Sequence, residues 1–126
     1  MLRSAELVAF VASRDLEAAD RFYGGVLGLE RVESSAFANV YDAHGTQLRV
    51  TRVEEVSPAL YTVVGWRVED VIAEIETLRA AGVAFKRYEA MSQDEHGVWT
   101  SPAGARIAWF VDPEGNVLSL QQAPAI

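Results

Sequence analysis

The stretch Asp112-Pro113-Glu114-Gly115-Asn116-Val117-Leu118-Ser119-Leu120 predicts a β-hairpin near the end of the chain. Asp112 and Pro113 favour a type I turn, and Gly115 can take the left-handed conformation that closes a bulged hairpin. Apolar residues lie on both sides of the turn, over 107–111 and 117–120. We therefore expect two antiparallel strands to meet here.

The same pattern occurs 70 residues earlier (112 minus 42), as Asp42-Ala43-His44-Gly45-Thr46-Gln47-Leu48-Arg49-Val50. In this alignment Arg49 matches Ser119. Further upstream in each half, an apolar run precedes an aspartate that is suited to cap a helix, Asp15 in the first half and Asp70 in the second. Two copies of one unit, rather than a solenoid, explain a repeat of this kind.

Apolar periodicity gives each half the order strand, helix and three strands. We expect strands at 6–12, 29–33, 36–41, 46–53, 60–68, 98–101, 105–111 and 117–120, with helices following Asp15 and Asp70. The first strands are offset by only 55 residues (63 minus 8), so the second half carries about 15 extra residues. We assign these to an inserted loop at 88–97. The predicted modules are 1–53 and 60–126, joined by a connector at 54–59.

Composition restricts the classes of function. The 126 residues carry a net charge of −7 and include no cysteine. The acidic balance disfavours nucleic acid as a partner, and the lack of cysteine excludes thiol catalysis and disulfides. No apolar run approaches the roughly 18 residues that a membrane span needs, and no signal peptide is visible at the N-terminus. We expect one cytoplasmic domain with no membrane contact.

The sequence resembles the vicinal oxygen chelate superfamily, which includes glyoxalases, bleomycin-resistance proteins and extradiol dioxygenases. The similarity lies in Arg21-Phe22-Tyr23-Gly24-Gly25-Val26-Leu27-Gly28-Leu29 after the Asp15 cap, in Val68-Glu69-Asp70-Val71, and in Asp112-Pro113-Glu114-Gly115-Asn116. The resemblance implies an α+β fold of two βαβββ modules whose curled mixed sheets enclose a concave pocket, and it implies a homodimer. It implies no particular reaction, because this fold supports many functions.

Metal-dependent members of this family place His, Glu or Gln at one point on the first and last strand of each module. The corresponding residues here are Val8, Arg49, Val63 and Ser119. Valine has no donor atom, arginine is a permanent cation, and a lone serine hydroxyl is a poor ligand for a divalent ion. We therefore expect no cofactor and no metal site of the family type. His44 is expected in a solvated turn, and His96 in the inserted loop.

Strand alternation predicts which side chains share a face with those four points. If both hairpins have bulged turns, Trp109 lies opposite Ser119, Asn39 opposite Arg49, Tyr41 opposite Gln47, and Phe37 opposite Thr51. A slip of one residue would turn the facing strand around. The predicted ligand-binding residues combine aromatic walls with a few polar groups: Phe10, Phe37, Asn39, Tyr41, Gln47, Arg49, Tyr61, Arg67, Trp109, Ser119 and Gln121. Glu6, Asp94 and Glu95 are candidate ion-pair partners for the two arginines.

The sequence is compatible with three functional hypotheses. The first is a metal-independent binding protein of the bleomycin-resistance type, which sequesters or carries a small aromatic molecule and is not an enzyme. The second is a glyoxalase-like lyase or isomerase, or a dioxygenase-related enzyme, with a non-standard site. The third is a degenerate member whose pocket is filled and which serves as an interaction module.

Overall fold

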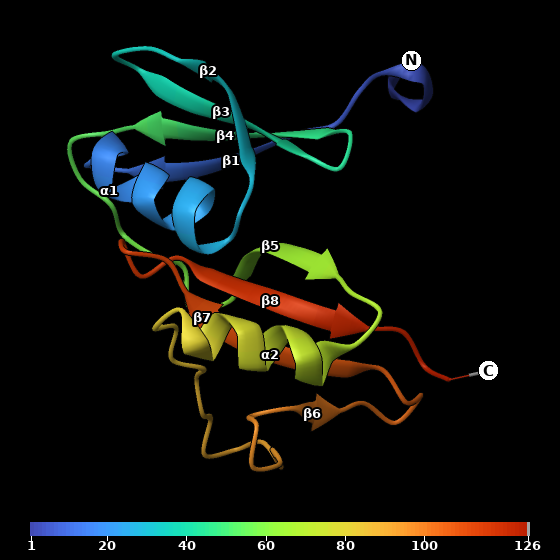
Figure 1. The fold of residues 1–126 in the computed structure, drawn as a ribbon. Helices are drawn as coiled ribbons and strands as arrows, with labels where there is room; N and C mark the ends of the chain where they lie inside the picture. Colours follow the sequence, from blue (N-terminus) through green and yellow to red (C-terminus); the bar gives the residue numbers. More distant parts are fainter. Residues whose placement is uncertain (126) are drawn as a thin grey trace. The chain divides into compact units, whose positions relative to one another are not determined.

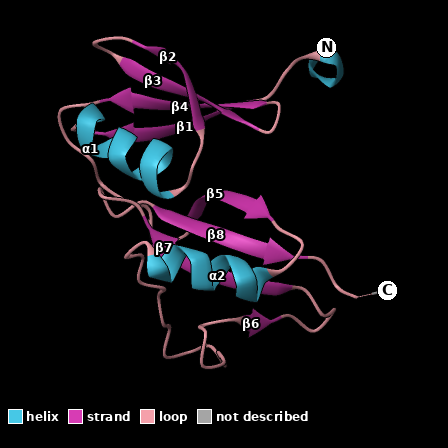
Figure 2. Cartoon of the chain, in the orientation of Figure 1, coloured by secondary structure: helices cyan, strands magenta, loops and turns pink. Residues whose placement is uncertain are grey.

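The computed structural model describes residues 1–125 and divides the chain into two compact units, Met1–Pro58 and Ala59–Ile126. Each unit has one four-stranded mixed sheet with a helix on one of its faces (Figures 1 and 2). The order of elements in each unit is βαβββ, so the predicted α+β class with two βαβββ modules is confirmed. The boundary between the units falls within the segment predicted as a connector.

The sheet of the first unit has the strand order β1-β4-β3-β2, with β1 parallel to β4 and the other pairs antiparallel. A short 3₁₀ turn, η1 (Leu2–Ser4), precedes the sheet, and a π-helical segment, η2 (Arg21–Val26), continues the helix. The other elements are β1 (Val8–Ser13), α1 (Leu16–Asp20), β2 (Glu30–Ser34), β3 (Ala38–Ala43) and β4 (Thr46–Arg52).

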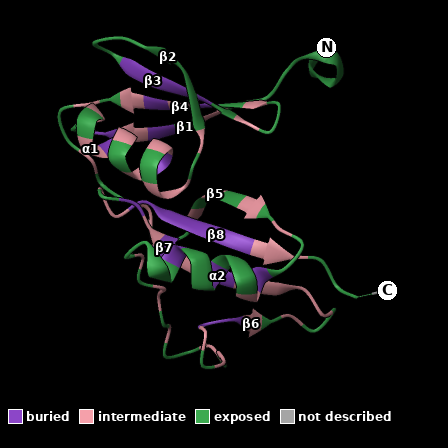
Figure 3. Cartoon of the chain, viewed as in Figure 1, coloured by how far each residue is buried: buried purple, intermediate pink, exposed green. Residues whose placement is uncertain are grey.

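The second unit repeats this topology with the order β5-β8-β7-β6. The segment between α2 and β6 is longer than its counterpart in the first unit and contains the predicted inserted loop. The elements are β5 (Thr62–Arg67), α2 (Val71–Ala80), β6 (Trp99–Thr100), β7 (Arg106–Val111) and β8 (Val117–Gln122). Figure 3 shows that most of β3 and most of β8 are buried, whereas β2 is exposed along its length.

Both helices begin at the predicted aspartates. The carboxylate of Asp15 accepts hydrogen bonds from the backbone N–H groups of Glu17 and Ala18, and that of Asp70 accepts one from Ala73. These bonds satisfy donors that have no partner inside the first helical turn. None of the helices within residues 1–125 is long and apolar enough to cross a membrane.

The second hairpin has the predicted register. Trp109 pairs with Ser119 and Ile107 with Gln121. The Asp112 carboxylate accepts from the N–H groups of Glu114 and Asn116, and Gly115 has φ = 88°. A type I turn that ends in a left-handed glycine gives the bulged three-residue loop that the sequence predicts.

The first hairpin is shifted by one residue from the predicted register, so the predicted pairing was wrong. Val40 rather than Asn39 lies opposite Arg49, and Tyr41 pairs with Leu48. The loop contains only His44 and Gly45, both at positive φ (52° and 92°), which is the two-residue type I′ geometry.

A proline explains why the two turns differ although each has four residues from its aspartate to its glycine. Ala43 pairs with Thr46 and belongs to the sheet in the first hairpin. Pro113 occupies the matching place in the second hairpin, where it has no N–H to offer to a β-ladder. The second turn therefore needs the longer loop, whereas the first closes with two residues.

Candidate functional site

The helix-free face of the second sheet carries a row of predicted site residues. Ser119 lies between Trp109 on β7 and Gly65 on β5. The alternate residues Leu118 and Leu120 are buried, and Gln122, in phase with them, accepts a hydrogen bond from the first residue of α2. Ser119 therefore faces away from the helix, together with Val117 and Gln121.

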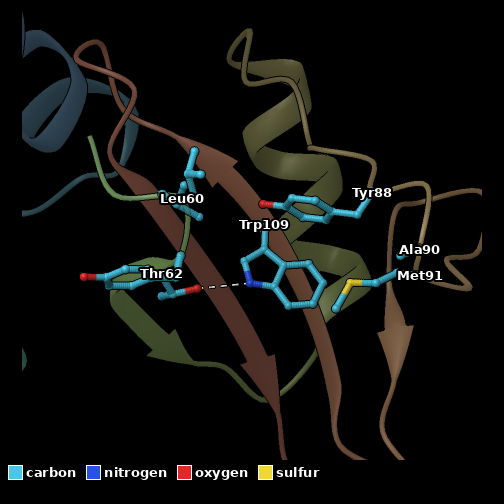
Figure 4. Close-up of a pocket in the computed structure, with 8 residues that line it drawn as sticks. Leu60, Thr62, Tyr88, Ala90, Met91 and Trp109 are labelled. Atoms are coloured by element: carbon cyan, nitrogen blue, oxygen red, sulfur yellow. Dashed lines mark hydrogen bonds between the residues drawn. The ribbon is translucent and has the colours of Figure 1, made fainter. Parts of the chain in front are cut away.

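A pocket of about 390 Å³ lies at one end of this face. Its volume is within the roughly 300–1,000 Å³ that is usual for small-molecule sites. The pocket is mainly apolar, and the polar groups of its side chains are three hydroxyls and the indole N–H of Trp109. It is lined by Leu60, Tyr61, Thr62, Tyr88, Ala90, Met91, Trp109 and Val117, six of which are labelled in Figure 4. Such a surface suits a flat, largely apolar molecule.

The indole of Trp109 is fixed in orientation. Its Nε1–H donates to Thr62 Oγ1 over 3.0 Å, as drawn in Figure 4. The ring of Tyr88 meets the indole edge-on, with centroids 5.5 Å apart, and Trp99 lies 6.4 Å away in a tilted arrangement. These contacts hold the indole as a rigid wall, which lowers the entropic cost of binding a ring against it.

The inserted loop contributes Tyr88, Ala90 and Met91 to the pocket, and Gln93 holds it in place. The Gln93 amide donates to the carbonyls of Lys86 and Gly97, at 3.1 and 2.7 Å, and accepts from the N–H of Tyr88 at 2.7 Å. The loop is thus a bonded part of the wall. Sequence reasoning located this insertion but did not assign it pocket residues, because an insertion has no counterpart in the other half.

Burial raises the pKa of Tyr88 above the usual value for tyrosine. Its hydroxyl therefore stays neutral across the physiological range and can donate a hydrogen bond. Lys86 Nζ lies 5.7 Å from the centre of the Tyr88 ring, within the range of a cation–π contact. The strands of this sheet carry one charge on the helix-free face, the guanidinium of Arg67, so the surroundings of the pocket favour electron-rich groups.

The structure brings only two of the predicted residues of this unit, Tyr61 and Trp109, into the pocket. Ser119, Gln121 and Arg67 lie further along the same face. Thr62 was not among the predicted ligand-binding residues. Regular alternation along the strand puts Tyr61, Val63 and Gly65 on one face, but a bulge between Thr62 and Val64 interrupts that alternation. No feature of the sequence marked that bulge.

In the first unit, β1 and β4 have the predicted facing. Phe10 pairs with Arg49, and Val8 with Gln47, on the face opposite to the buried Leu48 and Val50. The Phe10 side chain is 62% exposed, and Arg49 is half-buried. These residues share the open face of their own sheet.

The shifted register places Asn39 and Tyr41 on the helix side. Asn39 Nδ2 donates to the carbonyl of Leu16 at 2.9 Å, and the Tyr41 hydroxyl donates to Asp20 Oδ1 at 2.8 Å. Phe37 precedes β3 and is exposed. The prediction that Asn39 and Tyr41 share a face with Arg49 was wrong, because the two-residue turn shifts β3 by one residue against β4. The assignment of Phe37 to the ligand-binding residues stays a prediction.

Neither Arg49 nor Arg67 forms a hydrogen bond or ion pair through its guanidinium with any residue in 1–125, so the proposed partners Glu6, Asp94 and Glu95 do not hold them. Asp94 instead accepts from the N–H groups of His96 and Val98. An arginine without a protein partner on an open sheet face is available to an anionic group of a ligand.

Val8, Arg49, Val63 and Ser119, the residues expected at the family ligand points, include no carboxylate or imidazole. Gly65 and Phe10, not acidic or imidazole groups, lie beside Ser119 and Arg49 in their sheets. Among the described residues, no three histidine, aspartate or glutamate side chains gather as a metal-binding group. His44 lies exposed in its turn, and His96 lies 3.8 Å from both Glu76 and Glu95.

The chain belongs to the family described as the Glyoxalase/Bleomycin resistance protein/Dioxygenase superfamily, whose model matches residues 6–120. The recognition made from the three sequence segments is therefore confirmed. A search of curated proteins finds no match.

Solved structures show the same fold over nearly the whole chain. TnmS3, described as an antibiotic binding protein from Streptomyces sp. CB03234, is 25% identical, with a TM-score of 0.74 and 99% of both chains covered. A superfamily member from Sphaerobacter thermophilus DSM 20745 is 23% identical, with a TM-score of 0.74, covering 98% of this chain and 100% of that one. Lactoylglutathione lyase from Agrobacterium tumefaciens is 18% identical, with a TM-score of 0.73, and the match covers 95% of this chain and 94% of that one.

Proposed function

We propose that this protein binds an aromatic small molecule without a metal ion, and sequesters or carries it in the manner of bleomycin-resistance proteins. The observation that carries the proposal is the Trp109 indole, fixed by Thr62 and Tyr88 in the wall of a mainly apolar pocket. An oriented indole offers a flat surface on which a ligand ring can stack, and stacking adds affinity beyond the burial of area.

Two further observations support binding rather than catalysis. The residue types at the family ligand points are poor donors for a metal ion, and the pocket contains hydroxyls but no carboxylate or imidazole. General acid–base catalysis usually needs a group that titrates near the working pH. The likeness to an antibiotic-binding protein at 25% identity agrees with this proposal.

The proposal is tested by NMR titration of the Trp109 indole N–H with a panel of planar aromatics that includes 2-naphthol. Saturable shifts of this resonance are expected, with little change at Trp66, whose strand partner is Leu120 on the helix side. Ala90→Tyr should fill the pocket and abolish the shifts. Ala103→Tyr, in an exposed turn outside the pocket, is the matched control. A flat response at Trp109 to every compound would refute the proposal.

We also propose a homodimer. The two described sheets have β1 and β2, and β5 and β6, as their edge strands, and of these β1 and β5 carry no charge except Arg67 at the end of β5. Edges of this composition tend to be covered by other chain segments. Light scattering at tens of micromolar should give twice the chain mass of 13.8 kDa; a monomeric mass would contradict the proposal.

A further inference from the structure

A notch lies on the helix-free face of the second sheet, beside Trp109. Gly65 forms its floor. Because glycine has no Cβ, the Ser119 hydroxyl can lie directly over its Cα. A Cβ placed on Gly65 would be only 2.5 Å from Ser119 Oγ. Since real atoms do not approach so closely, glycine at position 65 is what allows the hydroxyl to take this position.

The Ser119 hydroxyl has no partner in the protein. The residue is only 8% exposed, yet Oγ forms no hydrogen bond with any side chain or backbone group of residues 1–125. Among the described residues, Thr51 Oγ1 is the one buried side-chain atom that lacks a hydrogen-bond partner, so the Ser119 oxygen is still reached by solvent. Its hydroxyl is therefore free to donate to a ligand atom that reaches the notch.

The position of the notch connects it with the pocket. Ser119 pairs directly with Trp109, and two residues along the same face of β8 lies Val117, which lines the pocket. A ring that stacks on the indole therefore has one edge close to the notch. On the helix-free face, the strands of this sheet carry one charged side chain, Arg67. It pairs with Gln121, which follows Ser119 by two residues on the same face of β8.

We infer that the Gly65–Ser119 notch is the subsite for an electron-rich oxygen of the aromatic ligand, a carbonyl, enolate or phenol oxygen, and that Ser119 determines specificity by donating to it. The inference rests on the proposed function, because the ring of the ligand must occupy the pocket. Arg67 is positively charged, and the strands carry no carboxylate on this face. The notch should therefore bind a ligand oxygen that accepts a hydrogen bond, and not a cationic or donor group.

The test compares two probes of nearly equal shape, 2-naphthol and 2-methylnaphthalene, by NMR titration of wild-type protein and variants. The measured quantity is the ratio of the two dissociation constants. Ser119→Ala should reduce the preference for the naphthol about five- to tenfold, the effect of one hydrogen bond, and should leave 2-methylnaphthalene binding unchanged. Ser119→Thr, which retains the hydroxyl, should keep much of the preference. Ser57→Ala removes an exposed hydroxyl in the first unit and is the matched control.

Gly65→Ala tests the notch itself. Its methyl group should displace the hydroxyl, lower the melting temperature and remove the preference for the naphthol. The double variant Gly65→Ala/Ser119→Ala should regain melting temperature, because the crowded oxygen is gone, but should not regain the preference. Failure of the double variant to recover would contradict the close contact.

The outcomes separate the subsite from the pocket. If both probes shift Trp109 and Ser119→Ala leaves their ratio unchanged, the oxygen subsite is refuted and the pocket stands. If neither probe shifts Trp109 in the wild-type protein, the proposed binding function and the subsite fail together.

Discussion

At the scale of single residues, Arg49 has a guanidinium group that is available to a ligand. It lies on the open face of its sheet beside Phe10, with no guanidinium partner within residues 1–125. A planar, permanently charged fork in that state suits a carboxylate, an enolate or a phenolate. Its assignment as a ligand-binding residue remains a prediction.

Replacing Arg49 by Met keeps most of the stem and removes the charge. Binding of naphthalene-2-carboxylate should weaken by roughly 1.5–3 kcal/mol, the scale of a hydrogen bond to a charged group. Calorimetric titration measures this effect, with Arg52→Met at an exposed position of the same strand as control. A loss that appears only in melting temperature would assign Arg49 to folding instead.

The side chain of Tyr41 is buried, and its hydroxyl stabilises the folded state. Its ring is fully buried, and burial, followed by the hydrogen bond to Asp20, raises the pKa of Tyr41 above its usual value. The folded protein therefore keeps the neutral phenol at a pH where the unfolded chain ionises, near pH 10. Stability from this residue is complete below about pH 10 and is lost as the pH rises further.

Tyr41→Phe should lower the free energy of unfolding by about 1–2 kcal/mol at neutral pH, because Asp20 loses a donor. It should also make the loss of stability at alkaline pH smaller than in the wild-type protein. Urea unfolding at pH 7 and at pH 11 measures both effects. Tyr61→Phe, at a side chain that is 72% exposed, is the control. An equally steep alkaline loss in Tyr41→Phe would contradict the assignment.

At the scale of elements, the two hairpins decide which side chains reach each face. Ala43 belongs to the ladder in the first hairpin, whereas Pro113 is excluded from it in the second. The Asp-x-x-Gly spacing is the same in both turns, so spacing alone could not reveal the difference.

Ala43→Pro should destabilise the protein by about 2 kcal/mol or more, because proline cannot supply an N–H at a paired strand position. A slip to the bulged register would remove Asn39 and Tyr41 from their partners on α1. His44→Asn keeps the two-residue loop and gives the Asn-Gly pair that type I′ turns prefer, so it should be neutral or slightly stabilising. Urea unfolding compares them. Equal stability of the two variants would contradict this account of the register.

The sequence predicted the elements, the helix caps and the second hairpin, because these depend on local patterns that are repeated in both halves. It missed the first register, because His44 takes a positive φ that few residues other than glycine adopt. It also missed Thr62, Tyr88 and Met91 as pocket residues. A β-bulge brings in the first of these, and an inserted loop brings in the other two, and neither follows from a duplicated pattern.

At the scale of the whole molecule, two units of one plan carry different chemistry. The second has the aromatic pocket, whereas the open face of the first has Phe10, Gln47 and Arg49. The residues expected at the family ligand points, Val8, Arg49, Val63 and Ser119, include no carboxylate or imidazole in either unit. The expected absence of a metal ion concerns both units, so it is tested on the whole protein.

Thermal melting with EDTA, and then with zinc, nickel or manganese, should show no shift in melting temperature. Linkage requires that an ion bound only to the native state raises the melting temperature. Metal analysis of the purified protein is the companion measurement. A fall of several degrees on chelation, with about one ion per chain, would overturn the expectation and favour a glyoxalase-like enzyme.

The proline of the second turn has a consequence for how such proteins diverge. Pro113 is exposed and does not line the pocket, yet the turn that it forces gives the register that places Trp109 beside Ser119. In a duplicated gene, a single change between alanine and proline at this turn position is therefore enough to shift the register by one residue. The side chains of one strand then exchange the two faces of the sheet, although no residue within the strand has changed. Comparisons of relatives that align only pocket residues would overlook this switch, so their turns should be compared first.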